Sequence, residues 1–374
     1  MIIGILKEGN GENRTALIPE HVVVLKKLKV DIFVENGSGE NSFITDDAFR
    51  NAGANIAIKD EVINKADLIV CISIPSEDTL AKFKSGQVLV GGLNPVINKS
   101  IIEIISGKGI SSFSLDFIPR TTRAQSMDIL SSMATIAGYK AVLDAAGHLP
   151  RFFPMFMSAA GTIKPAKVLI LGAGVAGLQA IAVGRKLGAV VEVFDVRAAV
   201  KDEVKSLGGK FIEVEGAKEE AAAGGYAVEQ TEEFKQKQRD LIHEHAKNAD
   251  VVICTAQIPG RKAPVLLTKA TVEEMRAGSI VIDLAASTGG NCEVTQNGKT
   301  ILHNQVSIVG KSDYPSDMPF DASKMFGNNI VNFLKLLITP EGQLNLNFND
   351  DLIQGTCITH GGQIVNNKYK QLIS

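Results

Sequence analysis

The sequence contains no tryptophan, only four cysteines and almost no net charge, since 39 lysines and arginines face 41 aspartates and glutamates. A formal net charge of −2 gives no electrostatic reason to expect nucleic acid or an acidic membrane as a partner. The cysteines lie far apart, and Cys71 and Cys254 sit inside apolar runs typical of buried strands. This pattern favours reduced, structural thiols and a reducing compartment.

Long apolar runs are also missing. A membrane span needs about 20 consecutive apolar residues, and the nearest approach, residues 168–184, is interrupted by glycines and Gln179. A buried strand, turn and helix explain that stretch better. The first eight residues indicate a strand and lack the basic-then-apolar layout of a signal peptide. We therefore expect a cytoplasmic chain that does not itself cross a membrane.

Short apolar segments alternate with helical patterns through both halves of the chain, which favours an α/β fold with parallel sheets covered on both faces. Longer helical patterns cover residues 126–148 and 321–337. We expect two Rossmann-like domains joined by these two long helices. The first comprises residues 1–126 with 321–374, and the second, residues 127–320, binds NAD(H). The predicted strands are 2–6, 31–35, 55–58, 68–72, 88–90, 112–116, 167–171, 190–195, 209–214, 250–255, 279–284 and 306–309.

Residues 172–177, with the sequence GAGVAG, follow a predicted strand directly and open a predicted helix. In a Rossmann unit, Gly172 permits a tight turn, Gly174 lets the backbone approach the pyrophosphate, and Gly177 lets the helix pack on the strand. The helix N-terminus at Val175 offers N–H groups and a positive dipole end to the phosphates. This context predicts a dinucleotide site, the alternative being a glycine-rich turn that binds nothing.

Asp195 ends the next predicted strand, eighteen residues after Gly177. Its carboxylate can accept hydrogen bonds from the adenosine ribose and would repel a 2′-phosphate, which favours NAD(H) over NADP(H). Arg197 stands nearby and weakens this inference slightly, because an arginine could hold that phosphate.

The run RTTRAQSMDILSS, residues 120–132, resembles the signature of the NAD(H)-binding subunit of proton-translocating nicotinamide nucleotide transhydrogenase. Residues 172–180, 195–199, 206–211 and 224–227 are similar to it as well, and the likeness covers essentially the whole chain. The resemblance implies the soluble first domain of an α subunit, here a separate polypeptide ending at Ser374. It also implies a homodimer, held on the cytoplasmic face of the inner membrane by an NADP(H)-binding β subunit and a membrane-spanning subunit.

The same resemblance implies residue roles. The nicotinamide pocket would be lined by Arg120, Gln125, Asp128 and Ser131. Three of them are spaced three residues apart and share one face at a helix start, although N-terminal capping by Ser126 or Asp128 is the alternative. Further contacts to the nucleotide would come from Arg123, Val175, Val196, Arg197, Gly225, Tyr226, Gln238 and Gln257. Tyr226 would lie on a mobile loop, 215–230, that closes over the nucleotide, whereas Gln257 departs from the apolar residue expected there.

Residues 7–8 and 13–19, with the sequences KE and NRTALIP, also look similar to alanine dehydrogenases. That resemblance implies a substrate-binding lysine, an acid/base histidine and an aspartate in an enzyme of that type. Ser73, Asn94 and Ser287 occupy those positions. Oxidising an amine moves a proton as well as a hydride and so requires an acid/base group. Transfer between two nicotinamide rings breaks and makes only C–H bonds and needs orientation instead. The sequence thus predicts transhydrogenation, with an alanine-type dehydrogenase and a non-catalytic NAD(H) sensor as alternatives. His243 and His245 do not share a helix face, so we predict no metal site.

Overall fold

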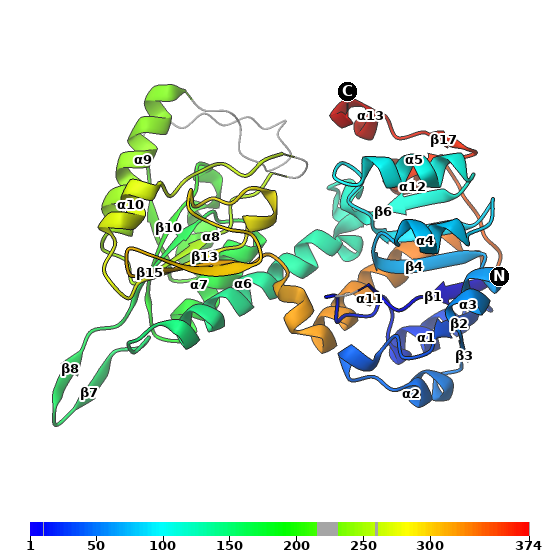
Figure 1. Cartoon of the computed structure of the whole chain (residues 1–374), viewed down its shortest axis with the longest axis horizontal. Helices are drawn as coiled ribbons and strands as arrows, with labels where there is room; N and C mark the ends of the chain where they lie inside the picture. Colours follow the sequence, from blue (N-terminus) through cyan, green and yellow to red (C-terminus); the bar gives the residue numbers. More distant parts are fainter. Residues whose placement is uncertain (10, 215–230, 259–260, 374) are drawn as a thin grey trace. The chain divides into compact units, whose positions relative to one another are not determined.

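The computed structural model describes residues 1–9, 11–214, 231–258 and 261–373. The chain divides into two compact units. The first unit contains Met1–Met133 and Pro315–Ser374, and the second contains Ala134–Tyr314 (Figure 1). Among the described residues, no helix combines the length and apolarity that a membrane crossing requires.

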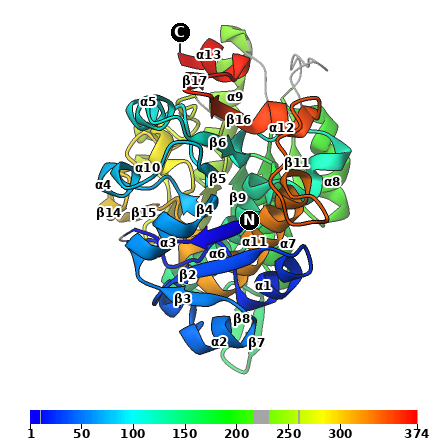
Figure 2. The same cartoon turned by 90° about the vertical axis from the view of Figure 1, so that its right-hand side faces the viewer.

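The first unit is built on an eight-stranded sheet with the order β17-β16-β6-β5-β4-β1-β2-β3. Six strands are parallel, and β16 and β17 add an antiparallel edge (Figure 2). The parallel strands β2 and β3 lie on one side of β1, and β4, β5 and β6 lie on the other. The strand order therefore reverses between β1 and β4. The strands are β1 (Ile2–Ile5), β2 (Asp31–Glu35), β3 (Asn55–Ala57), β4 (Leu68–Ser73), β5 (Val88–Gly92), β6 (Ser111–Ser114), β16 (Cys357–His360) and β17 (Gln363–Ile364).

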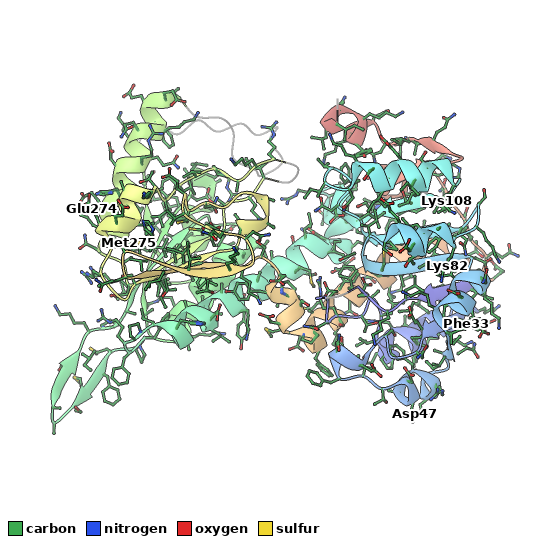
Figure 3. The ribbon with its side chains drawn as sticks, in the orientation of Figure 1. Phe33, Asp47, Lys82, Lys108, Glu274 and Met275 are labelled. Carbon is green, nitrogen blue, oxygen red and sulfur yellow. The ribbon has the colours of Figure 1, made fainter. Side chains whose placement is uncertain are left out.

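Helices cover both faces of this sheet. Successive residues of a strand point to opposite faces, so neighbouring residues pack against different helices. In β4, Val70 packs in the cluster that contains residues of α11, and Ile69 packs in the cluster that contains residues of α5. Lys82 and Lys108 tie surface segments together by donating to Asp60 and to the Ala81 carbonyl (Figure 3). The helices are α1 (Pro19–Lys26), α2 (Asp46–Asn51), α3 (Lys59–Lys65), α4 (Glu77–Ala81), α5 (Lys99–Gly107), α11 (Pro319–Leu337), α12 (Asp351–Thr356) and α13 (Asn367–Ile373).

The second unit has a seven-stranded sheet with the order β11-β10-β9-β12-β13-β15-β14. Six strands are parallel in the 3-2-1-4-5-6 order of the doubly wound dinucleotide fold, and β14 pairs antiparallel at the edge. The predicted α/β class with two parallel sheets is therefore confirmed. The strands are β9 (Lys167–Leu171), β10 (Val190–Phe194), β11 (Lys210–Ile212), β12 (Val251–Cys254), β13 (Ile280–Asp283), β14 (Lys299–His303) and β15 (Val306–Gly310).

Both faces of the second sheet are also buried. Ile170 packs with Ala145 of α6 and Ile181 of α7, while Leu169 packs with Ile242 of α9 and Val272 of α10. A separate hairpin, β7 (Phe156–Ser158) and β8 (Gly161–Ile163), extends away from the rest of this unit (Figure 1). The helices are α6 (Ile129–His148), which runs from the first unit into the second, α7 (Val175–Lys186), α8 (Lys201–Ser206), α9 (Glu232–Ala246) and α10 (Lys269–Glu274).

Candidate functional site

The glycine turn after β9 has the geometry that a dinucleotide fingerprint requires. Gly172 has a φ of +106°, a conformation that side chains rarely adopt. A Cβ atom on Gly177 would lie 1.9 Å from the Gly172 carbonyl oxygen. Two of the three glycines are therefore required by the turn itself and by the contact between α7 and β9.

Gly174 differs from its two neighbours in the motif. A Cβ placed there meets nothing within 4 Å, so the fold itself does not require a glycine. The residue is the N-cap of α7 in extended conformation, with no side chain capping it, and Val175 follows with 40% of its surface exposed. The first turn of α7 contains no acidic residue. The open space thus lies against a helix N-terminus that favours an anion.

Thr255 follows β12 and connects it to this turn. Its hydroxyl lies 2.9 Å from the Gly172 carbonyl oxygen and 3.2 Å from that of Leu171, to which it donates. Since β12 and β10 flank β9 on opposite sides, the turn stands at the switch point of the sheet, where ligands bind in open α/β folds. Thr255 was not singled out from the sequence, because its role depends on the neighbouring strand.

Asp195 follows β10 at the same edge, and its side chain is only 6% exposed. Its Oδ2 accepts from the Ala173 N–H at 2.7 Å, which ties the carboxylate to the glycine turn. Arg197 Nε and Nη2 lie 2.9 and 2.7 Å from Oδ1 and Oδ2, and form a two-pronged ion pair. Val196, between them, is half-buried. The structure thus brings the predicted glycines, Asp195 and Arg197 to one place.

Two predicted glutamines lie in the second unit. Gln238 is buried on α9 with 8% exposure. Gln257 follows β12, and its Nε2 donates to the Leu284 carbonyl at 3.0 Å. Gly225 and Tyr226, with the whole predicted loop 215–230, lie outside the described residues.

Asn291 shapes the segment after β12 and was missed from the sequence. It is fully buried, its Oδ1 accepts from the Ala256 N–H, and its Nδ2 donates to the Ala256 and Pro264 carbonyls. Asp283, also fully buried, accepts from the N–H groups of Ala285 and Cys292. Burial raises the pKa of this carboxyl above its ordinary value. Neither residue stands in a recognisable motif.

The predicted nicotinamide-pocket residues belong to the first unit. Asp128 directly precedes α6, where its Oδ1 accepts from the Ser131 N–H at 2.9 Å and its Oδ2 from the Ser131 hydroxyl at 2.6 Å. Asp128 is therefore the N-cap of α6. The helix therefore begins at Ile129 and not at Ser126, and a 3₁₀ helix, Thr122–Met127, precedes it.

The other members of this group lie on the surface. Arg120 and Gln125 are exposed. Arg123 is also exposed, and its guanidinium pairs with Asp350 Oδ1 and Oδ2 at 2.7 and 2.8 Å and with Asp351. This pairing joins the segment to the start of α12.

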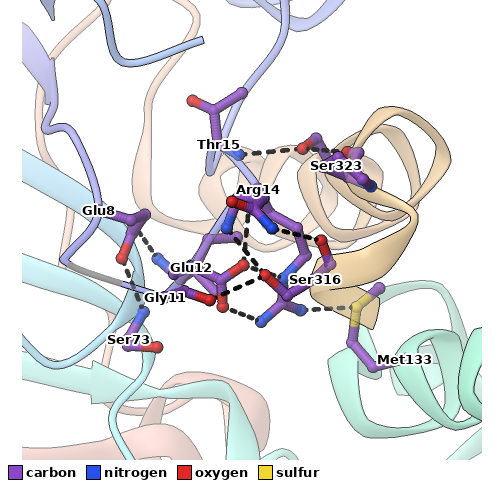
Figure 4. Close-up of polar contacts among 12 residues, drawn as sticks. Glu8, Gly11, Glu12, Arg14, Thr15, Ser73, Met133, Ser316 and Ser323 are labelled. Atoms are coloured by element: carbon purple, nitrogen blue, oxygen red, sulfur yellow. Dashed lines mark hydrogen bonds and ion pairs between the residues drawn. The ribbon is translucent and has the colours of Figure 1, made fainter. Parts of the chain in front are cut away.

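A polar cluster at the carboxyl ends of β1 and β4 was not predicted as a site (Figure 4). Glu8 accepts from the N–H groups of Ile72 at 2.6 Å and Ser73 at 3.2 Å. Burial raises the pKa of Glu8 to about 7. Arg14 pairs with Glu12 at 2.5 Å, and its Nη1 also lies 2.9 Å from Met133 Sδ.

The three positions at which an alanine dehydrogenase would carry its chemistry are all polar and neutral. Ser73 ends β4, and its N–H group donates to Glu8. Asn94 is exposed at a φ of +43°, and its N–H donates to Asp116. Ser287 lies in a short 3₁₀ helix, where its N–H donates to Ser312. None of these side chains can act as a strong acid/base group near neutral pH.

We then compared the chain with known protein families. The family model described as "Alanine dehydrogenase/PNT, N-terminal domain" matches residues 4–137, and its C-terminal counterpart matches residues 141–367. The chain belongs to the alanine dehydrogenase/PNT family.

Within this family, the chain is 44% identical over 375 residues to an NAD(P) transhydrogenase subunit alpha polypeptide of Rhodospirillum rubrum, covering 98% of each. A crystal structure of transhydrogenase from Sinorhizobium meliloti matches 98% of this chain and 100% of its own, with a TM-score of 0.90 at 42% identity. The alanine dehydrogenase of Mycolicibacterium smegmatis is 26% identical over 98% of this chain and 95% of its own. The predicted relationship to transhydrogenase α subunits is confirmed, and alanine dehydrogenases are more distant.

Proposed function

We propose that this chain is the NAD(H)-binding component of a transhydrogenase and exchanges a hydride directly with NADP(H) on a partner subunit. The observation that carries the proposal is the geometry of the glycine turn. Of its three glycines, only Gly174 has free space where a side chain would stand, and the Ala173 N–H joins the turn to Asp195. That arrangement suits a pyrophosphate at the start of α7 and a ribose beside the carboxylate.

The reaction would move one hydride, with its electron pair, from C4 of one nicotinamide ring to C4 of the other. One ring is oxidised and the other reduced, and no proton enters or leaves the reacting carbons. Ser73, Asn94 and Ser287 support this reading, because a direct ring-to-ring transfer needs no acid/base side chain. The pocket residues Arg120, Gln125, Asp128 and Ser131 would orient the ring in this proposal.

The second nucleotide and the membrane step are assigned to other subunits. An NADP(H)-binding β subunit would present the second ring, and a membrane-spanning subunit would couple the exchange to proton translocation. Both would hold this chain at the cytoplasmic face of the inner membrane. The names of the relatives support this division, since they are α subunits of NAD(P) transhydrogenases.

A homodimer is part of the same proposal. The β7–β8 hairpin supports it, because Met155, Phe156, Met157 and Ile163 expose between 40% and 70% of their surface. Phe152 and Phe156 stack with ring centroids 4.8 Å apart. Exposed apolar side chains grouped on one projecting element are typical of a protein interface.

The test is a paired exchange assay. The purified chain is mixed with an NADP(H)-binding transhydrogenase subunit, and reduction of an NAD analogue by NADPH is followed spectroscopically. We expect turnover only when both proteins are present. Intact NADH binding without any exchange would overturn the catalytic role and favour an NAD(H)-sensing module.

The chain alone is assayed in parallel with alanine and NAD⁺. We expect no NADH formation, because the lysine, histidine and aspartate of an alanine dehydrogenase are replaced. Alanine-dependent reduction of NAD⁺ by the chain alone would instead establish a self-sufficient amino-acid dehydrogenase. The two assays therefore separate all three functions.

A further inference from the structure

The carboxylate of Asp195 accepts four hydrogen bonds from the protein itself. Oδ1 accepts from the backbone N–H and the Nε of Arg197, at 2.8 and 2.9 Å. Oδ2 accepts from the Ala173 N–H and from Arg197 Nη2, both at 2.7 Å. Three of the four donors belong to Arg197.

The guanidinium of Arg197 has the geometry that binds phosphate. Its planar fork matches a carboxylate or a phosphate equally well, and a fork that holds one cannot hold the other. The side chain is 25% exposed, so it lies within reach of a ligand at the end of β10. This is the edge where the adenosine ribose of a bound dinucleotide would lie.

We propose that Asp195 sequesters Arg197. The arginine lies at the ribose 2′ position, but its guanidinium is held by the Asp195 carboxylate and is therefore not available to bind a phosphate there. The inference rests on the proposed NAD(H) site and names the pair that decides between NAD(H) and NADP(H). Discrimination then has two parts. Asp195 repels a 2′-phosphate, and it also holds the guanidinium of Arg197, which could otherwise neutralise that phosphate.

Binding of NADP(H) would cost free energy because the Asp195–Arg197 ion pair is largely buried. To bind a 2′-phosphate, Arg197 must leave Asp195, whose side chain is 6% exposed and would face a doubly charged group without its counter-charge. A buried charge that loses its partner is strongly disfavoured. Replacing the carboxylate by a neutral group of the same shape removes both obstacles at once. The amide oxygen of Asn can still accept from the Ala173 N–H, while its NH₂ group cannot accept from Arg197 Nε, so the two-pronged ion pair is lost.

The experiment compares two probes that differ only in the 2′-phosphate, 5′-AMP and 2′,5′-ADP. Isothermal titration is carried out on the wild-type chain and on Asp195→Asn, Arg197→Gln and the double variant. For the wild type we expect 5′-AMP to bind more tightly than 2′,5′-ADP. In Asp195→Asn the ratio of the two affinities should shift towards 2′,5′-ADP by tenfold or more, about the worth of one charge-assisted hydrogen bond.

The double variant tests whether Arg197 supplies the gain. We expect Asp195→Asn with Arg197→Gln to lose the improved binding of 2′,5′-ADP, and Arg197→Gln alone to show no improvement. The gain should also shrink in high salt, since it depends on a charge pair at a partly exposed side chain. Asp195→Ala is titrated alongside, so that the comparison survives if the Asn variant fails to fold by circular dichroism.

The outcomes separate this inference from the function on which it rests. A wild-type chain that binds neither NADH nor 5′-AMP would overturn the NAD(H) site. A wild-type chain that binds NADH, with folded Asp195 variants that do not gain 2′,5′-ADP, would overturn the sequestration of Arg197 alone. A gain that persists in the double variant would overturn it too, because another group would then bind the phosphate.

Discussion

A Cβ atom on Gly327 would lie 2.2 Å from both Cε1 and Nδ1 of His21, so these residues set how closely α1 and α11 pack. The imidazole is buried and held from both sides. The Ile18 N–H donates to Nδ1 at 3.1 Å, and Nε2 lies 3.1 Å from Oδ1 of Asn328. The ring therefore cannot move aside without losing a hydrogen bond.

Gly327→Ala is accordingly expected to destabilise the first unit by about 1–3 kcal/mol, the usual cost of overpacking a core. That cost outweighs the gain of up to about 1 kcal/mol that alanine normally brings to a helix interior. Urea unfolding followed by circular dichroism measures the change. Gly147→Ala in α6 is the control, because a Cβ there meets nothing within 4 Å, and it should leave stability unchanged or raise it. Equal stability of the two variants would contradict the packing argument.

Glu8 gives the first unit a pH-dependent contribution to stability. Burial raises its pKa from 4.5 to about 7, so the folded state binds a proton that the unfolded chain has already released between these values. The contribution is complete below pH 4.5 and is lost as the pH rises through about 7. We expect the stability of the wild type relative to Glu8→Gln to fall between about pH 4.5 and 7.5 in urea titrations. Glu77→Gln, at an exposed position of α4, is the matched control for the change of charge. A difference that stays constant with pH would rule out this role for Glu8.

The parts of the fold that could be predicted from sequence are those in which a local pattern reflects burial. Strands such as β9 and β12 are buried on both faces and form continuous apolar runs. The glycine turn carries its own signature because Gly172 and Gly177 are required by the backbone. The hairpin β7–β8 could not be predicted, since all six of its strand residues are exposed and no face is apolar against a core.

Contacts between distant segments account for most of what was missed in the candidate site. Arg123 was predicted to contact the nucleotide, and its pairing with Asp350, 227 residues away, has no trace in the local sequence. Asn291 resembles any loop asparagine until Ala256 and Pro264 are seen to surround it. The capping role of Asp128 was foreseen as an alternative because N-caps depend only on residues three positions apart.

The glycine turn offers a pair of substitutions that separate binding from folding. Gly174→Ala adds a methyl group to open space at ordinary φ, so the midpoint of unfolding should stay close to that of the wild type. The same methyl group would stand where a pyrophosphate approaches, and we expect NADH affinity to fall tenfold or more. Gly177→Ala should instead destabilise the second unit, because its Cβ overlaps the Gly172 carbonyl oxygen. Fluorescence titration with NADH and thermal unfolding measure the two effects. Unchanged NADH affinity in Gly174→Ala would argue against a phosphate at this turn.

The proposed homodimer is tested at the hairpin. Met157 is 70% exposed, and a charge placed there would be buried without a partner if a second copy covers it. We expect Met157→Asp to shift the chain towards monomer in sedimentation equilibrium while its circular dichroism is unchanged. Leu302→Asp, at a 72% exposed apolar position on β14, is the matched control and should leave the mass unaltered. The same mass for both variants would show that the hairpin does not form the interface.

Asp128 and Ser131 have two possible roles, capping of α6 and lining of the nicotinamide pocket. Three substitutions distinguish these roles. Asp128→Ala removes the N-cap of α6 and should cost about 1 kcal/mol of stability. Asp128→Asn keeps an oxygen for the Ser131 N–H and should cost little, since asparagine caps helices as well as aspartate does. Ser131→Ala keeps the backbone bond and loses the hydroxyl contact with Oδ2.

If these side chains only cap α6, the last two variants should exchange hydride with the NADP(H)-binding partner at the wild-type rate. The proposed function predicts a fall of tenfold or more in both, without a matching loss of stability, because a group that orients the ring acts through its charge or its hydroxyl. Ser126→Ala is the control, since the structure uses the backbone oxygen of Ser126, which accepts from Asn329. Rates that follow stability across all four variants would assign the motif to capping, whereas rates that fall at constant stability require contact with the nucleotide.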